Sequence, residues 1–395
     1  MSTYRLTYDT LTADLHRAYL DARRHKRSRP YQQHFEARLE ENLGALCREL
    51  WERSYRPGRS TCFIITDPKK REVFAARFRD RVVHHLYYNY VHEMLERTFI
   101  ADTYSCIRER GTHYGIRRLE RHIRRESLNY TRRCWVLKMD IRGYFMHIGR
   151  ERLLDITLRR LESMAVHRVT KGSPLRWCDC VDMDFVRWLT RVVIMQDPTD
   201  GCRRQGTLLD WYGLPPGKSL FNSPDGCGLP IGNLTSQLFS NVYLNELDQY
   251  VKRHLHCRHY GRYVDDFYIV SADRERLKSL QRPVASFLRN ELGLVVNEQK
   301  TQVLDVRCGV EFLGAYLKPR RRYVSRQTLH RMEEKLPSLA AECDAGRLRS
   351  RLNSFLGILG HYRSYRLRRR LFFGLRQVYR YGCFLQGMRK YVLYP

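Results

Sequence analysis

The stretch Tyr263-Val264-Asp265-Asp266-Phe267-Tyr268-Ile269-Val270 sets two adjacent carboxylates among aromatic and β-branched residues. Residues of these two kinds favour strands, so the pattern predicts a strand–turn–strand over 260–270 with Asp265 and Asp266 at its tip. Hairpin turns ordinarily use Asn-Gly or Asp-Gly, and two neighbouring carboxylates repel each other. A divalent cation would offset that repulsion; the plainer alternative is an exposed acidic turn.

A third carboxylate ends another predicted strand. Residues 134–139 (CWVLKM) form a buried strand that stops at Asp140. Mg²⁺ binds carboxylate oxygens together with substrate phosphates, and two such ions can stabilise the attacking and leaving oxygens of nucleotidyl transfer. We therefore expect Asp140 to face the aspartate pair and two Mg²⁺ ions to be the cofactor, with Mn²⁺ as the alternative ion.

Composition points to a polyanionic partner. The 395 residues include 72 Lys and Arg against 42 Asp and Glu, a net charge of +30, which is typical of nucleic-acid binding. A 43% hydrophobic content excludes wholesale disorder. The sequence has no apolar run of membrane-spanning length and no apolar signal core at its N-terminus. We expect no membrane partner and a cytoplasmic location.

Strands and helices are expected to interleave along the chain. This order predicts an α+β fold with a helical appendage. The expected elements are two helices within 10–55, a strand at 61–66, a helix at 74–97, an irregular stretch at 170–228, helices at 235–255 and 274–292, a strand pair at 310–318 and basic helices from 325 to the end.

The order of several segments resembles that of reverse transcriptases over roughly 60–320. WVLKMDIRGYF (135–145) resembles the first metal motif of their palm, and RYVDDF (262–267) the second. Four further segments resemble two fingers motifs, a motif ending in Lys300 and the primer grip: 66–91, 99–119, 292–303 and EFLGAYL at 311–317. The resemblance implies a right-hand polymerase fold and an RNA-directed DNA polymerase.

The resemblance also implies a division into domains. It predicts an N-terminal helical extension (1–60), fingers (61–136), a first palm segment (137–154), a fingers insertion (155–227), a second palm segment (228–318) and a short helical thumb (319–395). This division leaves no segment for an RNase H or endonuclease domain.

The matching motifs assign roles at the metal site. Asp140, Asp265 and Asp266 are the expected metal carboxylates, and Ile141 would add its backbone carbonyl. Lys300 would either protonate the pyrophosphate leaving group, as a general acid does, or contact phosphate without proton transfer.

Other matching positions concern the nucleotide and the primer. Lys69 and Arg71 match the pair that clamps the triphosphate, with Lys70 as an alternative to Lys69. Phe145 matches the aromatic residue that excludes the ribose 2′-hydroxyl, and Phe312, Leu313 and Gly314 match the primer grip. Phe145 has a structural alternative as a core phenylalanine, and Lys69 and Arg71 have one as a solvated charge run.

The segment Gly228-Leu-Pro-Ile-Gly-Asn-Leu-Thr-Ser-Gln237 resembles reverse transcriptases of diversity-generating retroelements. Most other reverse transcriptases have a Pro-Gln-Gly turn there, so Ile231, followed by Gly232, replaces a hydrogen-bonding glutamine beside the incoming dNTP. The subfamily implies error-prone copying of a template-repeat RNA, with mutations at adenine, through an RNA–cDNA duplex. It also implies a small, basic, oligomeric accessory protein.

Two alternatives stay open. One is another bacterial reverse transcriptase, from a retron, a group II intron or a phage-defence system, in which GLPIGNLTSQ is usually replaced by a Pro-Gln-Gly form. The other is a non-catalytic RNA-binding scaffold, against which the intact Asp140, Asp265 and Asp266 argue.

Overall fold

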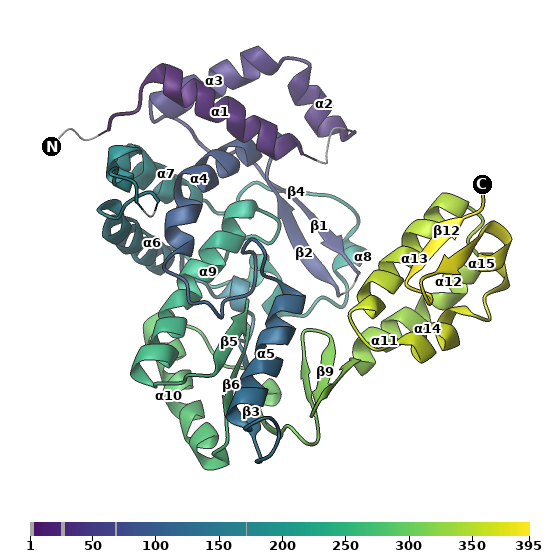
Figure 1. The fold of residues 1–395 in the computed structure, drawn as a ribbon. Helices are drawn as coiled ribbons and strands as arrows, with labels where there is room; N and C mark the ends of the chain where they lie inside the picture. Colours follow the sequence, from purple (N-terminus) through teal and green to yellow (C-terminus); the bar gives the residue numbers. More distant parts are fainter. Residues whose placement is uncertain (1–3, 25–27, 68, 171) are drawn as a thin grey trace.

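The structure is a computed structural model that describes residues 4–24, 28–67, 69–170 and 172–395 (Figure 1). Three helices form the N-terminal part: α1 (Tyr8–Arg23), α2 (Pro30–Glu36) and α3 (Leu39–Trp51). Helix α1 buries its apolar face against the long helix α4 (Phe78–Glu96). The sequence predicted two helices here, but the chain breaks between α2 and α3, where Arg38 leaves helical geometry.

A small sheet follows, with strand order β2-β1-β4. Strands β1 (Thr61–Ile65) and β2 (Arg71–Ala75) form an antiparallel hairpin, and β4 (Arg203–Arg204) pairs parallel to β1. The predicted helix at 74–97 was placed too early, because Glu72 and Phe74 point inward with strand periodicity and helix begins only at Phe78.

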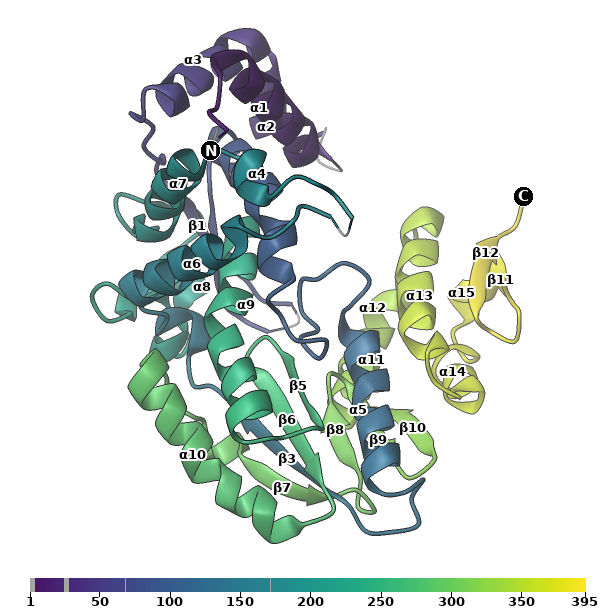
Figure 2. The same ribbon diagram turned by 60° about the vertical axis from the view of Figure 1, so that its left-hand side comes forward.

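The central sheet has the order β5-β6-β3-β7, and all its neighbours are antiparallel. Its strands are β3 (Trp135–Asp140), β5 (Tyr260–Tyr263), β6 (Asp266–Ser271) and β7 (Gln302–Asp305). Helix α5 (Thr112–Glu126) covers one face, while α9 (Leu234–Gln249) and α10 (Arg274–Leu292) lie at the other (Figure 2). The central strands β3 and β6 are buried on both faces, which fits their mostly apolar sequences.

Helices α6 (Arg150–Ala165) and α7 (Met183–Met195) pack beside α4 and α9. Helix α7 corrects the prediction that 170–228 is irregular throughout. Asp182 caps its first turn, and Phe185, Val186, Leu189 and Ile194 give it a buried face. The rest of 170–228 contains only β4, the one-turn α8 (Leu208–Trp211) and three short 3₁₀ turns in the described residues.

Strands β8 (Val310–Phe312), β9 (Ala315–Lys318) and β10 (Arg321–Val324) lead from the central sheet into a C-terminal lobe. The lobe contains α11 (Arg326–Glu334), α12 (Leu336–Ala340), α13 (Ala345–Gly360), α14 (Tyr365–Phe372) and α15 (Arg376–Tyr381). It lies apart from the N-terminal helices in both views (Figures 1 and 2).

The sequence predicted helices up to the end of the chain, but this prediction is wrong for the last residues. A hairpin of β11 (Gly382–Leu385) and β12 (Lys390–Leu393) packs on α13. Asn353 of α13 bonds the backbone of Tyr391 in both directions, at 2.8 and 2.9 Å. The predicted α+β fold is confirmed, with antiparallel sheets and helices alternating along the chain.

Candidate active site

Strand register brings the three predicted aspartates together. Asp140 at the end of β3 is the direct cross-strand partner of Asp266 at the start of β6. Cross-strand partners point to the same face of a sheet, with Cβ atoms about 5 Å apart. Asp265 lies in the two-residue turn that joins β5 to β6. The sequence predicted that Asp140 faces the aspartate pair, and the pairing of β3 with β6 brings these residues together.

The three carboxylates form a site that is short of positive charge. Burial, together with the charge of Asp140, raises the pKa of Asp265 to about 6. Burial likewise raises the pKa of Asp266 to about 6, although Lys138 opposes the effect. Such raised values mark carboxylates whose ionised forms would be stabilised by an added cation.

Two lysines supply part of that charge. The Lys300 ammonium group donates to Asp140 Oδ2 at 2.7 Å, and Lys138 Nζ lies 3.9 Å from Asp266 Oδ1. Burial alone would lower the pKa of Lys300, but the hydrogen bond and the charges of the aspartates raise it overall. Within the described residues, no group of three His, Cys, Asp or Glu side chains is arranged to hold a metal ion. The side chains of Asp140, Asp265 and Asp266 still suit a hard cation, since they offer carboxylate oxygens as ligands.

The turn that carries Asp265 is strained. Val264 has φ 55°, a left-handed conformation that β-branched residues avoid. Two polar contacts hold its backbone: Arg262 Nη1 donates to the Val264 carbonyl at 3.0 Å, and the Val264 amide donates to Ser105 Oγ at 3.2 Å. Strain of this kind persists where the surroundings over-determine it.

Arg262 is itself fixed by a buried ion pair. Both side chains of the Arg262–Asp248 pair are 0% exposed, and the guanidinium contacts the two carboxylate oxygens at 2.7 and 2.6 Å. Tyr260 and Thr103 also donate to Asp248, at 2.6 and 3.0 Å. The strained turn is therefore held by a buried hydrogen-bonded network that joins β5 to α9 and to the segment before α5.

The residues predicted to bind the triphosphate lie on the β1–β2 hairpin. Lys69 and Arg71 are exposed there, and the positive charge of Lys69 lowers the pKa of Asp266. Lys70 instead donates to the Tyr212 carbonyl at 2.6 Å. This contact favours Lys69 over Lys70 as the member of the pair that faces the aspartates.

Phe145 and Ile231 share one small apolar cluster. Both are half-buried and pack against buried Cys62, Phe74, Met146 and Leu220. The backbone of 231–232 lies against β2, since the Phe74 amide donates to the Ile231 carbonyl at 2.9 Å. Gly232 has φ 128°, and a Cβ there would lie 2.9 Å from the Phe74 carbonyl oxygen. Only glycine fits at this position.

The segment predicted as the primer grip joins β8 to β9. Phe312 is fully buried and packs edge-on against Tyr268, with ring centroids 5.1 Å apart. Leu313 and Gly314 form the turn, both with positive φ. The Gly314 carbonyl accepts from the Ser325 amide at 2.9 Å, which ties this turn to the C-terminal lobe. Of the three residues, Phe312 belongs to the core, while Leu313 is half-buried at the edge of the same cluster.

Residues 189–317 match the protein family described as reverse transcriptase (RNA-dependent DNA polymerase). The chain contains a reverse transcriptase domain. The matched range includes Asp265, Asp266, Lys300 and the β8–β9 turn, and the match confirms the predicted superfamily and enzyme class.

Relatives of this reverse transcriptase domain are distant. The protein YkfC of Escherichia coli (strain K12) is 25% identical over 349 residues, which cover 78% of this chain and 80% of that protein. An apo telomerase of Candida tropicalis has a TM-score of 0.48 at 11% identity, over 76% of this chain and 52% of that one. A telomerase of Candida albicans with a telomeric RNA fragment has a TM-score of 0.45 at 10% identity, over 87% and 59%. The chain thus spans between half and three-fifths of these telomerases.

Sequence reasoning missed two features of the candidate site. Lys138 lies in the middle of an apolar strand, where a lysine is unusual, and its charge acts on Asp266. Arg262 precedes the aspartate hairpin, and its partner Asp248 interrupts the apolar face of α9. A charged residue at a position that should be buried was the available signal in each case.

Proposed function

We propose that the chain is the RNA-directed DNA polymerase of a diversity-generating retroelement, copying a template-repeat RNA into cDNA with errors at adenine. The observation that carries the polymerase function is Asp140 opposite Asp266, with Asp265 in the adjoining turn. The subtype rests on the GLPIGNLTSQ segment, in which an apolar Ile231 packs beside Phe145.

In this proposal the carboxylates of Asp140, Asp265 and Asp266, with the Ile141 carbonyl, would hold two divalent cations, Mg²⁺ or alternatively Mn²⁺. Bound there, the cations supply charge stabilisation to the attacking 3′-oxygen and the leaving pyrophosphate. Lys300 would move off Asp140 and either donate its proton to the pyrophosphate or contact its phosphates. While Lys300 is bonded to Asp140 its pKa is raised by that hydrogen bond and by the aspartate charges, so the side chain starts out protonated.

The other partners are assigned by position. Lys69 and Arg71 would hold the dNTP triphosphate, Arg71 through a guanidinium that matches phosphate oxygens in pairs and Lys69 as a point charge. The template RNA and the RNA–cDNA duplex would lie against the fingers, palm and thumb, whose boundaries are those of the predicted domain division. The Leu313–Gly314 turn would contact the primer. The accessory protein and the cytoplasmic location rest on the family resemblance and the sequence. No helix in the described ranges is both long and apolar enough to cross a membrane.

Primer extension on an RNA template tests the proposal and its alternatives. Incorporation of dNTPs by the wild-type protein separates a polymerase from a non-catalytic RNA-binding scaffold. Sequencing of the cDNA then separates the subtypes, because a retron, intron or defence enzyme is not expected to concentrate its errors at template adenine.

An Ile231→Gln variant is expected to make fewer errors opposite adenine than the wild type. Isoleucine offers the incoming nucleotide only van der Waals contact, whereas glutamine restores a directional hydrogen bond. One such bond contributes about 1 kcal/mol, roughly a fivefold change in discrimination. The measurement is the error spectrum of cDNA made from one RNA template by both proteins.

The matched control for this experiment is Ile231→Met, which keeps an apolar side chain of similar volume and should leave the spectrum unchanged. Equal spectra for wild type and Ile231→Gln would show that Ile231 is a bystander. Infidelity would then arise elsewhere, for instance from the accessory protein or the RNA.

A Phe145→Ala variant is expected to accept ribonucleotides. Removal of the half-buried ring opens the space that a 2′-hydroxyl would occupy, and steric rejection of this kind is worth roughly 10- to 200-fold. The readout is the ratio of rNTP to dNTP incorporation. Phe221→Ala is the control, because Phe221 packs in the same apolar cluster. A ratio that rises equally in both variants would refute the role of Phe145.

A further inference from the structure

The C-terminal lobe contains a buried arginine without a counter-ion. Three arginines of the described residues are buried: Arg150, Arg262 and Arg368. Arg150 pairs with Asp197 at 2.9 Å, and Arg262 pairs with Asp248 at 2.6 Å. Arg368, in α14, is 4% exposed, yet its Nε and Nη1 atoms are buried without a hydrogen-bond partner among the described residues. A buried charge is normally paired, because its removal from water costs free energy that only a partner offsets.

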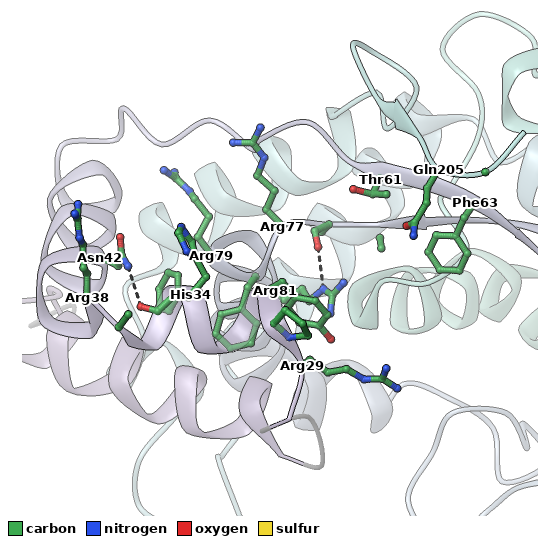
Figure 3. A pocket seen from close by; sticks show the side chains of 18 of the residues that line it. Arg29, His34, Arg38, Asn42, Thr61, Phe63, Arg77, Arg79, Arg81 and Gln205 are labelled. Carbon is green, nitrogen blue, oxygen red and sulfur yellow. Dashed lines mark hydrogen bonds between the residues drawn. The ribbon is translucent and has the colours of Figure 1, made fainter.

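Half-buried arginines elsewhere also have partners. In the cavity lined by α2, α3 and the start of α4, Arg81 donates to the Ala76 carbonyl at 2.9 Å, and Arg79 pairs with Glu49 (Figure 3). Arg368 differs from these arginines, since the part of the chain that the structure describes offers it neither a carbonyl nor a carboxylate. This difference points to a partner from another molecule.

The surroundings of Arg368 are positively charged. Burial, and then the charge of Arg389 in the turn between β11 and β12, lower the pKa of Arg368, and no acidic side chain of the described residues opposes them. Residues 345–395 contain no Asp or Glu but twelve Lys and Arg. Arginine nonetheless stays protonated in proteins. The partner that fits Arg368 is therefore an anion.

This anion can reach Arg368 from solvent. The Nη2 atom makes no hydrogen bond to the described residues and is not fully buried, and Arg389 is exposed beside it. The turn that carries Arg389 packs on the start of α14, because a Cβ on Gly387 would lie 4.0 Å from the Tyr365 ring. We call Arg368 and Arg389 together the paired-arginine site. Guanidinium groups match the oxygens of a phosphate in pairs, so a phosphate group suits this site.

The exposed face of α14 extends the paired-arginine site. Tyr365 lies one helical turn before Arg368 and is 51% exposed, and Phe373 is 57% exposed. In the described residues Arg370 pairs with Glu333, whereas Arg366 and Arg369 form no ion pair. Unpaired bases stack on exposed rings while arginines bind the adjoining phosphates. These residue types favour single-stranded RNA over an acidic peptide, whose carboxylates have no rings to stack. A cavity of about 540 Å³ is lined here by Tyr365, Arg366, Arg369, Arg370, Phe373 and Gly374.

The β11–β12 hairpin lies on the outer face of the lobe. Helix α13 stands between this hairpin and the rest of the chain in both views (Figures 1 and 2), and it packs on β12. The aspartates lie in the central sheet, on the other side of α13. The paired-arginine site is therefore separate from the surface that the proposed function gives to the copied duplex.

We propose that Arg368 and Arg389 bind a phosphodiester group of single-stranded RNA on the outer face of the C-terminal lobe, with neighbouring bases against Tyr365 and Phe373. The inference goes beyond the proposed function, because this RNA segment lies outside the duplex that is copied. It depends neither on primer extension nor on the error spectrum.

The test measures binding of a labelled single-stranded RNA oligomer to the full chain, without dNTPs or divalent metal. The protein is first saturated with a short unlabelled RNA–DNA duplex, so that the oligomer reports on surfaces outside the cleft. R368M should weaken binding about tenfold, the effect of losing one charge-assisted contact. The salt slope of log Kobs should fall by about 0.7, the contribution of one phosphate on a single strand. R389Q, which replaces an exposed side chain, should weaken binding in the same direction.

The matched control is R349M. Arg349 is exposed on α13 and forms no ion pair in the described residues, so its loss should leave the affinity for the oligomer unchanged. Unchanged affinity in both R368M and R389Q would overturn the proposal, as would an equal loss in R349M. Partial recovery of binding by R368K would support a phosphate contact, because lysine keeps the charge without the paired geometry.

Melting temperatures separate a binding site from a structural arginine. In buffer without phosphate or RNA, R368M should melt no lower than the wild type, because methionine keeps the length of the side chain and removes an unpaired buried charge. The oligomer should raise the melting temperature of the wild type more than that of R368M. A clearly lower melting temperature of R368M without ligand would show that Arg368 stabilises the fold, and would overturn the proposal.

Two competitors identify the anion. Inorganic phosphate that displaces the oligomer at an equal concentration of phosphate groups would assign the site to a free anion. Polyglutamate that binds through Arg368 more tightly than RNA would assign it to an acidic protein. Either result would overturn the assignment to RNA. Failure of the proposed polymerase function would appear as absent primer extension, which these measurements do not include.

Discussion

An Asp265→Asn variant is expected to lose dNTP incorporation while RNA binding stays nearly intact. Asparagine keeps the volume of the side chain but removes the charge that would hold a divalent cation. Such cations supply several kcal/mol of transition-state stabilisation, so the rate should fall on the order of a thousandfold. Single-nucleotide incorporation and RNA affinity, measured on one primer–template, check the two halves of this prediction.

The Asp265→Asn variant should also fold at least as well as the wild type in metal-free buffer at neutral pH. Burial and Asp140 raise the pKa of Asp265 to about 6, so the folded state holds its proton more tightly than the unfolded state does. The carboxylate therefore costs stability as pH rises through about 6. The variant removes that cost, and a melting temperature at neutral pH that is not lower than the wild-type value separates a catalytic defect from misfolding.

Asp155→Asn is the matched control, since Asp155 is exposed on α6 and makes no side-chain hydrogen bond or ion pair within the described residues. It should behave as the wild type in every assay. Full activity of Asp265→Asn would refute the assignment of Asp265 as a metal ligand.

Local pattern was sufficient to predict the elements around the site. The strand–turn–strand at 260–270 and the helix at 274–292 have strong periodicity over their whole length, and the structure has β5, β6 and α10 there. Asp273 as N-cap and Gly293 with φ 63° after the helix give α10 clear ends. Where periodicity and end signals agree, tertiary contacts have little to override.

Elements defined by distant pairing were missed. Strand β2 is only five residues long and directly precedes a helix, so its residues extended the helical pattern; its pairing with β1 and with the Ile231 carbonyl makes it a strand. The final hairpin β11–β12 lies in a basic, helix-like region and is held by Asn353 from another element. Sequence periodicity contains no information about such partners.

The candidate site also combines features that local sequence predicts with features that depend on distant contacts. Asp140, Asp265 and Asp266 could be predicted because Asp140 ends a strand with a recognisable apolar pattern and the aspartate pair lies at the tip of a recognisable strand–turn–strand. The network behind them could not, because Thr103, Asp248 and Arg262 come from three different elements and meet only in the fold. That network is also where the second large effect is expected.

An Arg262→Met variant is expected to destabilise the protein by about 3–5 kcal/mol. Methionine resembles arginine in length but leaves the buried Asp248 carboxylate without its cation, and loss of one partner of a buried ion pair has this magnitude. Tyr260 and Thr103 would still donate to Asp248, but neutral donors do not replace the charge. Denaturant unfolding at neutral pH measures the loss, and a change below about 1 kcal/mol would contradict it.

The double variant Arg262→Met/Asp248→Asn separates stability from positioning. Asparagine removes the unpaired charge. Its oxygen can accept from one of the Tyr260 and Thr103 hydroxyls and its amide nitrogen can donate to the other, so most of the lost stability should return. The hydrogen bond from Arg262 to the Val264 carbonyl does not return, and the left-handed Val264 costs roughly 1–2 kcal/mol when it is unsupported. The turn that carries Asp265 should then relax, and kcat should stay about tenfold low with KM for dNTP little changed. If kcat recovers together with stability, the role of Arg262 is only to stabilise the fold. If kcat stays low in a stable protein, Arg262 positions the turn that carries Asp265.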